Sequence, residues 1–465
     1  MQVVKKMKLQ AIILAAGAGT RMKSKLPKVL HKVCGEPMLQ HVIDAAYQSD
    51  IEECIVVVGH GAQTVKNSLT KDIKTVLQKE QLGTGHAVMM TYDQLTEEGT
   101  VLILNGDGPL ITEDTLRELL AYHQEKGYNA TVLTADLANP HGYGRIVRGT
   151  DNGLMKIVEE KDASPEEKMI KEINSGLYCF DAKALREALP RITKENAQGE
   201  YYLTDALAII AGMGKEVGVY KTKDYEDIMA VNAKGQLAQV EEIMRRRIAE
   251  KHMEEGVTII NPSHTYIEKH VKIGRDTIVY PGVILVGDTV IGEDCTIGAN
   301  TRIEDSKIGD SVTIHHSTIL QSTVGKCTTV GPYAYVRPNS HIGKHVKIGD
   351  FVEIKNAFIG DHSKASHLAY IGDAEVGSHV NIGCGVVFVN YDGKNKHKTI
   401  IRDHAFIGSN SNLIAPVIVE EYGYVASGST ITKSVEKGAL AIARSHQHNK
   451  AGWVEDKGLL KTKEE

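Results

Sequence analysis

The stretch Ile267–Ile303, IEKHVKIGRDTIVYPGVILVGDTVIGEDCTIGANTRI, decides the fold of the second half of the chain. Its apolar residues recur at every sixth position, and glycine follows three of them: Ile267, Ile273, Val279, Leu285, Ile291, Ile297 and Ile303. Neither a helix nor an ordinary strand has this period, whereas a triangular β-coil with six residues on each face does. The pattern therefore predicts stacked coils whose inward side chains lie about 4.8 Å from their equivalents one coil away.

The period of six continues towards the end of the chain. After a one-residue slip it resumes in three series: Ile308 and Ile314; Val324, Val330, Val336, Ile342, Ile348 and Ile354; and Ile401, Ile407, Leu413, Val419, Val425 and Ile431. The stretch Val389–Thr399, VNYDGKNKHKT, breaks the period, so we expect it to loop out of the prism. Roughly ten coils are expected in all.

The first half of the chain follows a different pattern, in which short β-rich runs alternate with helical stretches. AIILAA at 11–16, CIVVVG at 54–59 and VLILNGD at 101–107 read as strands, with the helical MLQHVIDAAYQ at 38–48 between the first two. This alternation predicts a mostly parallel sheet covered by helices, with a ligand site beyond the carboxyl ends of the strands.

One amphipathic helix is predicted over 234–253, because apolar residues recur there at spacings of three and four. The sequence thus predicts an α/β Rossmann-like domain over 1–232, a helical linker over 233–253 and a β-helix domain with a tail over 254–465. A chain of 465 residues is long enough for two such cores.

Composition excludes some classes of protein. The net charge of -5 gives no nucleic-acid signal, and no apolar run is long enough to span a membrane. The six cysteines are scattered without metal-ligand spacing and are read as reduced thiols. We therefore expect a cytoplasmic protein that binds no nucleic acid and does not span a membrane.

A phosphate-binding loop is predicted at Leu14–His31, LAAGAGTRMKSKLPKVLH, which directly follows a strand. Gly17 and Gly19 let the backbone turn and direct successive N–H groups to one place, beside the positive charges of Arg21 and Lys28. Asp107 ends the strand VLILNGD, so its carboxylate is expected at the same edge of the sheet, where a hard cation such as Mg²⁺ takes one or two protein oxygens.

The motif LAAGxGTRM followed by Pro-Lys resembles the signature of sugar-nucleotide pyrophosphorylases. The resemblance implies that the loop holds UTP, that Arg21 and Lys28 act catalytically on its phosphates, and that Asp107 and Asn232 hold Mg²⁺. It also implies nucleotide and sugar contacts from Leu14, Ala15, Ala16, Gly17, Gln78, Gly83, Thr84, Gly144, Glu159, Asn174 and Asn232. The reaction implied is attack of a sugar phosphate oxygen on the α-phosphorus of UTP, which needs no general base because the attacking phosphate is already ionised.

A second site is predicted on the prism, where basic and amide side chains gather at mid-length. Arg337 and Lys355 are 18 residues apart, one coil on the same face, so both can grip one phosphate group. His367 lies two faces onward from Lys355, and a single subunit is not expected to bring the two together. An imidazole suits the base that takes a proton as an amine attacks a thioester.

The hexapeptide pattern resembles the left-handed parallel β-helix family, whose members are typically trimers and often acyltransferases. With the loop at Leu14–His31, the whole chain resembles the bacterial enzymes that acetylate glucosamine-1-phosphate and join the product to UMP, making UDP-N-acetylglucosamine for the cell wall. This resemblance implies a homotrimer with acetyl transfer at subunit interfaces and His367 as the base. It implies glucosamine-1-phosphate contacts from Arg337, Lys355, Tyr370 and Asn381, and acetyl-CoA contacts from Asn390, Tyr391, Ser409, Ser427 and Arg444.

Two alternatives remain open at this point. One is a pyrophosphorylase whose β-helix is structural or regulatory, although such coils would not be expected to carry Arg337, Lys355 and His367 together. The other is a trimerising or cargo-binding module without catalysis, which the complete glycine loop with Asp107 and Asn232 argues against.

Overall fold

The computed structural model describes residues 8–70, 73–150 and 152–459. The remaining positions of the predicted domain ranges, 1–7, 71–72, 151 and 460–465, lie outside the described residues. The chain forms two compact units, Met1–Arg247 and Ile248–Glu465. The division falls inside helix α7 (Lys234–Glu254), so this one helix supplies residues to both units.

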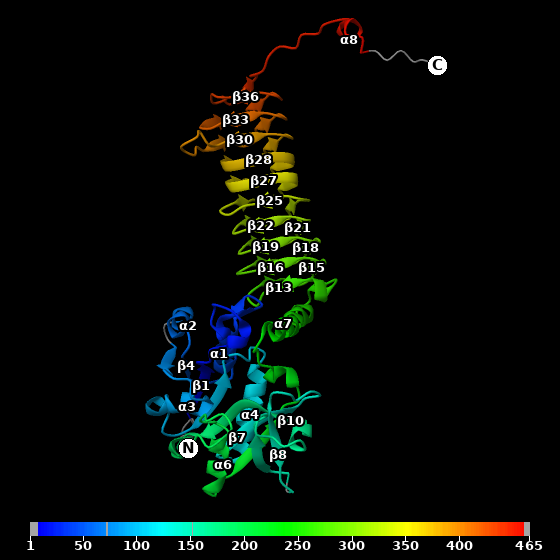
Figure 1. Ribbon diagram of the computed structural model, residues 1–465. Helices are drawn as coiled ribbons and strands as arrows, with labels where there is room; N and C mark the ends of the chain where they lie inside the picture. Colours follow the sequence, from blue (N-terminus) through cyan, green and yellow to red (C-terminus); the bar gives the residue numbers. More distant parts are fainter. Residues whose placement is uncertain (1–7, 71–72, 151, 460–465) are drawn as a thin grey trace, which may run out of the picture. The chain divides into compact units, whose positions relative to one another are not determined.

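The first unit is built around a twisted sheet with the strand order β11-β7-β10-β6-β1-β4-β5. Its strands are β1 (Leu9–Ala15), β4 (Glu53–Val58), β5 (Lys74–Leu77), β6 (Thr100–Asn105), β7 (Ala130–Asp136), β10 (Glu172–Asp181) and β11 (Val217–Lys221), with the hairpin β8 (Gly144–Arg148) and β9 (Leu154–Val158) added to β10. The helices are α1 (Met38–Gln48), α2 (Ala62–Ser68), α3 (Thr84–Met89), α4 (Glu113–Lys126), α5 (Ala182–Ala188) and α6 (Asp205–Gly212). Figure 1 shows these elements around the sheet.

Both faces of this sheet are buried, because successive side chains of β1 enter different cores. Ala11 and Ile13 pack into a cluster with residues of α1, α2 and α4, whereas Ile12 packs into a second cluster with residues of α3, α5 and α6. This explains why AIILAA is an unbroken apolar run.

The prediction of a mostly parallel sheet holds for β5, β4, β1 and β6, but strand β10 makes the sheet mixed. It pairs antiparallel with β6, β7 and β8. As a result the beginning of β10, with Asn174 opposite Thr134 near the end of β7, lies at the edge where the parallel strands end.

The second unit is a prism of parallel strands, visible in Figure 1 as stacked rungs from β13 (Tyr266–Ile267) to β36 (Thr430–Ile431). Among the described residues it has 26 strands, from β12 (Thr258–Ile259) to β37 (Leu440–Ala441). All have two or three residues except β27 (Lys347–Ile359) and β28 (Lys364–Val376). Most strands pair with the third strand onward, so each coil has three sides.

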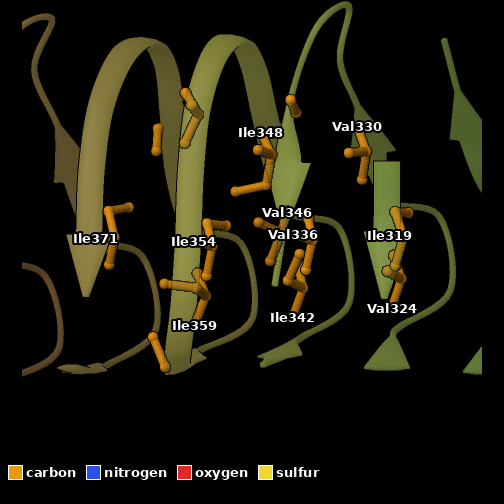
Figure 2. Packing of buried hydrophobic residues seen from close by; sticks show 14 of the residues in the cluster. Ile319, Val324, Val330, Val336, Ile342, Val346, Ile348, Ile354, Ile359 and Ile371 are labelled. Atoms are coloured by element: carbon orange, nitrogen blue, oxygen red, sulfur yellow. The ribbon is translucent and has the colours of Figure 1, made fainter. Parts of the chain in front are cut away.

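The inward positions are those that the period of six predicts. Ile267 stacks on Leu285, 18 residues onward, and every member of the predicted series is buried. The slip is real: Ile291 pairs with Ile308 and Ile303 with Ile319, so some sides use five residues rather than six. Figure 2 shows how Ile319, Val336 and Ile354 line the interior in successive coils. Each fully buried Ile or Val contributes about 1.5–3 kcal/mol.

One corner of the prism carries a stack of aromatic rings. His345, His362, His379 and His404 lie 4.8–4.9 Å apart between ring centroids. This spacing matches the predicted distance between coils. The predicted loop also leaves the prism, since strands β30 (Val387–Val389) and β31 (Thr399–Ile401) flank an exposed segment closed by a bridge between Tyr391 and Lys396.

Candidate functional sites

The loop after β1 bends sharply and approaches Lys28. Gly19 has a left-handed backbone with φ of 59°, and a Cβ there would lie 2.6 Å from the Lys28 Cβ. Nothing lies within 4 Å of the corresponding position at Gly17. Glycine at position 19 is therefore required by the turn and by the close approach of Lys28.

A cavity of about 270 Å³ opens at the carboxyl ends of the strands, where the alternating pattern predicted a ligand site. It brings together nine of the predicted residues: Leu14, Ala15, Ala16, Gly17, Lys28, Gln78, Gly83, Thr84 and Asp107. Gln81, Asn105 and Glu200 also line it and were not predicted. Asn105 ends the same apolar strand as Asp107, so the strand-end reasoning used for Asp107 applies to it as well.

Glycine is also required at position 83. Its φ is 111°, and a Cβ would lie 2.9 Å from the backbone nitrogen of Tyr201. The buried Gln78 donates to the Gly83 carbonyl over 3.1 Å. The segment from Gln78 to Thr84 is thus held rigidly against Tyr201 at one end of the cavity.

A cation already lies on the two predicted metal ligands. The Lys28 ammonium forms a salt bridge with Asp107 and lies 3.1 Å from Oδ1 of Asn232. Asn232 comes after all nine described strands of this sheet in the sequence, yet its side chain reaches the same ammonium group as Asp107. Two oxygen donors beside a cation form a set that Mg²⁺ also accepts.

A second group of predicted residues lies on β8 and β10 and directly after β9. Gly144 pairs with Asn174, and a Cβ on Gly144 would lie 3.2 Å from a Glu159 carboxylate oxygen. Burial, with the nearby charges of Asp162 and Asp205, raises the pKa of Glu159. Asn174 also exchanges hydrogen bonds with the hydroxyl of Tyr178.

Tyr143 lies between the two groups and was not predicted. Burial raises its pKa, and the charge of Asp107 adds to this effect. Arg21 lies in the short 3₁₀ helix Thr20–Met22, is exposed, and is not among the residues that line the cavity.

The second site is a cluster on one side of the prism. Arg337 donates to Glu353 over 2.8 Å, and Lys355 lies 3.5 Å from Asp373. Asn390 donates to Asp373 over 2.5 Å. These contacts place the two predicted phosphate-binding cations and Asn390 around neighbouring carboxylates.

Tyr370 belongs to the same cluster, since its hydroxyl lies 3.4 Å from the Asn390 side-chain nitrogen. Gly372 makes room for both, because a Cβ at this position would overlap the Tyr370 hydroxyl and lie 2.9 Å from the Asn390 nitrogen. Burial opposes ionisation of Asp373, but hydrogen bonds from Asn356 and Asn390 and the charge of Lys355 hold its pKa below the ordinary value.

Lys396 on the excluded loop was missed by the sequence analysis. The neighbouring amine of Lys355 lowers the pKa of Lys396, while the same interaction raises that of Lys355. Arg337 adds to the positive potential on Lys396. Three cationic side chains therefore converge, and an anion is the species that relieves their mutual repulsion. Tyr391, bridged to Lys396 across the loop, is exposed.

The remaining predicted residues lie elsewhere on the prism. Backbone hydrogen bonds join successive coils along one corner of the prism. They link Leu368 to Gly385, Cys384 to Asn410 and Ser409 to Gly428. The residues of this corner include His367, Ser409, Ser427 and Arg444, whose side chain lies 3.9 Å from the Cβ position of Gly428. Asn381 is on a third segment, β29 (Asn381–Ile382), opposite Lys364 and Phe406. One chain thus presents the cationic cluster and the His367 corner separately.

None of the helices in the described part of the chain combines the length and apolarity needed to span a membrane. All six cysteines, each within the described residues, are free.

Comparison with known proteins matches both halves. The nucleotidyl transferase family matches residues 10–237, and the bacterial transferase hexapeptide (six repeats) family matches residues 270–305 and 321–356. The chain is 70% identical to the bifunctional protein GlmU of Alkaliphilus oremlandii and 66% identical to that of Alkaliphilus metalliredigens, over 98% of this chain and 100% of each relative. It is 59% identical to the bifunctional protein GlmU of Clostridioides difficile, over 97% of this chain and 98% of the relative.

Proposed function

Because the chain belongs to the GlmU family of bifunctional proteins, we propose that its two sites divide the two reactions of one synthesis. The chain is a glucosamine-1-phosphate acetyltransferase and a uridylyltransferase, and it makes UDP-N-acetylglucosamine. We assign uridylyl transfer to the cavity of the first unit and acetyl transfer to the prism. The functional divisions are 1–232 for the first reaction site, 233–253 for the connecting helix and 254–465 for the second.

The assignment of uridylyl transfer depends on Lys28 and Asp107, which line the cavity, and on Asn232, which contacts Lys28. In this reaction a phosphate oxygen of N-acetylglucosamine-1-phosphate attacks the α-phosphorus of UTP, and the bond to pyrophosphate breaks. Lys28 orients the phosphates and neutralises their charge. Because the reaction needs no proton transfer, these two effects are what lowers its activation barrier.

Asp107 and Asn232 would hold Mg²⁺, and the contacts of the Lys28 ammonium with oxygens of these two residues support a cation at this position. When bound, Mg²⁺ supplies charge neutralisation to the triphosphate. Leu14, Ala15, Ala16 and Gly17 bind the nucleotide through the backbone, while Gln78, Gly83 and Thr84 read the base. Arg21 reaches the β- and γ-phosphates from its exposed helix.

Gly144, Glu159 and Asn174 bind the N-acetylglucosamine ring. This assignment is supported by the close packing of Gly144 against Glu159 and by the position of Asn174 near the start of β10. A carboxyl and an amide offer both kinds of hydrogen-bond partner to sugar hydroxyls.

On the prism, Arg337 and Lys355 bind the phosphate of glucosamine-1-phosphate, with Lys396 beside them. Tyr370 and Asn381 contact the same substrate, and His367 is the base. Asn390, Tyr391, Ser409, Ser427 and Arg444 bind acetyl-CoA, with Arg444 suited to its phosphates.

The separation of these groups supports a homotrimer with the acetyl site between subunits. The cationic cluster and the corner with His367 are different parts of one prism, so a complete site requires the cluster of one chain to meet the corner of another. We assign the enzyme to the cytoplasm, which supplies UTP and acetyl-CoA, and six free thiols suit a reducing compartment.

Two single variants test the division of labour. Asp107→Ala should lose pyrophosphate release and keep coenzyme A release, and His367→Ala should do the opposite, each measured on one purified sample. Loss of both activities in either folded variant would contradict the assignment of separate sites.

A further inference from the structure

His367 is held by a carboxylate of the preceding coil. Its Nδ1 lies 2.7 Å from Oδ1 of Asp350. We propose that Asp350 is a positioning residue for acetyl transfer, which fixes the tautomer and the ring orientation of His367. The inference rests on the proposed function of His367 as the base.

The pair is built by the register of the two longest strands of the prism. Asp350 of β27 and His367 of β28 are direct partners in the parallel ladder, 17 residues apart in the chain. Immediately before them the two backbones touch, since a Cβ on Gly349 would overlap the carbonyl oxygen of Ser366. A slip of one strand past the other is therefore excluded by backbone contact.

The backbone turns in the same way just after each partner. Phe351 and Leu368 both have left-handed conformations, with φ of 56° and 36°. These corners stand one above the other, so the two side chains before them leave the prism in the same direction. The contact between Asp350 and His367 is thus a consequence of coil geometry at this corner.

Ionisation of Asp350 decides which ring nitrogen of His367 carries the proton. The hydrogen bond from His367 is the main cause that holds the pKa of Asp350 below its ordinary value. An ionised carboxylate can only accept, so Nδ1 must donate its proton. Nε2 is then left with a free lone pair.

This tautomer matches the needs of the reaction. As the substrate amine nitrogen bonds to the thioester carbonyl carbon, its proton passes to Nε2, and the resulting imidazolium is stabilised by the carboxylate on the other nitrogen. When the carbon–sulfur bond breaks, the proton passes to the departing sulfur and coenzyme A leaves as the thiol. Asp350 takes no proton at any step.

Other groups at this corner do not replace Asp350. Lys347, on the same strand, adds a smaller favourable charge to Asp350. The preceding coil presents Tyr333, stacked on Phe351, and the following coil presents Cys384, beside Gly385, which bonds to Leu368. Asp350 is the carboxylate among these groups, so it is the source of negative charge beside His367.

The alternative is that His367 and Asp350 form a surface ion pair without a catalytic role. Their side chains are 62% and 40% exposed in the single chain, which is compatible with such a pair. Exposed pairs of this kind contribute little to stability. A pair with no catalytic role would leave the pH dependence of acetyl transfer unchanged, which makes the pH profile the deciding measurement.

The experiment compares Asp350→Ala and Asp350→Asn with the unsubstituted protein, following coenzyme A release over a range of pH and pyrophosphate release in the same samples. Asp350→Ala should lower the acetyltransferase kcat by about 10–100-fold with little change in KM. Asp350→Asn can still accept from Nδ1, so it should keep more activity, with the acid limb of its profile moved to lower pH because the stabilising charge is gone. Asp361→Asn, at a carboxylate that accepts the Lys344 backbone N–H, is the matched control and should match the unsubstituted protein.

The outcomes separate this inference from the proposed function. If His367→Ala is inactive while both Asp350 variants keep the normal kcat and pH profile, the positioning role is wrong and the base assignment stands. If His367→Ala retains acetyl transfer, the base assignment itself fails. If Asp350→Ala also loses pyrophosphate release, the test depends on Asp350→Asn. The inference is then wrong if the acid limb of the pH profile for coenzyme A release is unchanged in Asp350→Asn.

Discussion

The ammonium nitrogen of Lys28 lies 3.1 Å from Oδ1 of Asn232, although 204 residues separate the two in the chain. The same nitrogen also contacts Asp107 at the end of the neighbouring strand β6. A lysine therefore occupies the two oxygens that we assign to Mg²⁺, and binding of the metal requires this ammonium to move towards the phosphates.

Lys28→Met should consequently have two effects. Uridylyl transfer should fall by about 10²–10³-fold in kcat/KM, because a positive charge on the phosphates is lost. In the absence of nucleotide, added Mg²⁺ should raise the melting temperature of Lys28→Met more than that of the unsubstituted protein, because Asp107 and Asn232 no longer hold the ammonium. Lys25→Met, on an exposed lysine of the same loop, is the control for both measurements. Equal Mg²⁺ responses in all three proteins would contradict the shared position.

Lys396→Ala should weaken binding of glucosamine-1-phosphate. Charge-assisted contacts contribute about 1.5–3 kcal/mol, so KM should rise by about tenfold or more while the pyrophosphorylase activity is unchanged. Steady-state kinetics of coenzyme A release give the KM directly. Lys394→Ala removes a nearby exposed charge from the same loop and should have a much smaller effect; similar values for the two variants would mean that only the general positive potential matters.

Lys396 also shows where sequence reasoning stops. The period of six placed Arg337 and Lys355 one coil apart, and the structure confirms that their positions follow directly on the paired residues Val336 and Ile354. Lys396 lies in the loop that interrupts the period, so no repeat relates it to Lys355. The contact depends on how the bridge between Tyr391 and Lys396 folds the loop back.

Strand direction limited the predictions for the first unit in a similar way. The end of a parallel strand sufficed to locate Asp107 at the ligand edge. Asn174 reaches that edge only because β10 runs antiparallel, and the alternating apolar pattern does not reveal strand direction. Likewise, Asp350 pairs with His367 because this coil has 17 residues rather than 18. The period of six in the sequence does not predict this shorter coil.

Burial of His123 should make the stability of the first unit depend on pH. The side chain lies between α4 and β7, where its Nδ1 is 2.9 Å from the Thr131 hydroxyl, and burial lowers its pKa from 6.5 to about 4. Between these values the unfolded chain binds more protons than the folded one, so stability that is complete above pH 6.5 is lost as the pH falls towards about 4. A shift of this size corresponds to roughly 3 kcal/mol.

His123→Gln tests this effect, since glutamine keeps a hydrogen-bond partner for Thr131 but does not titrate. Urea unfolding of both proteins at about pH 7 and about pH 5, with hydrogen exchange of α4 as the local probe, should show a smaller loss of stability in the variant on acidification. His141→Gln, at an exposed histidine, should behave like the unsubstituted protein. An equal acid loss in His123→Gln would assign the pH dependence to carboxylates instead.

Mixed assemblies test whether acetyl transfer needs two chains. Lys355 and His367 belong to different parts of the prism, so Lys355→Ala and His367→Ala each remove one half of a shared site. In an equal mixture that exchanges subunits, about a quarter of the interfaces should combine an intact Lys355 from one chain with an intact His367 from another, and activity should return to that level. If both residues of one chain served one site, such mixtures would stay inactive. An equal mixture of the unsubstituted protein with the doubly substituted chain completes the argument, because it should give about a quarter of full activity for a shared site and about a half for a site within one subunit.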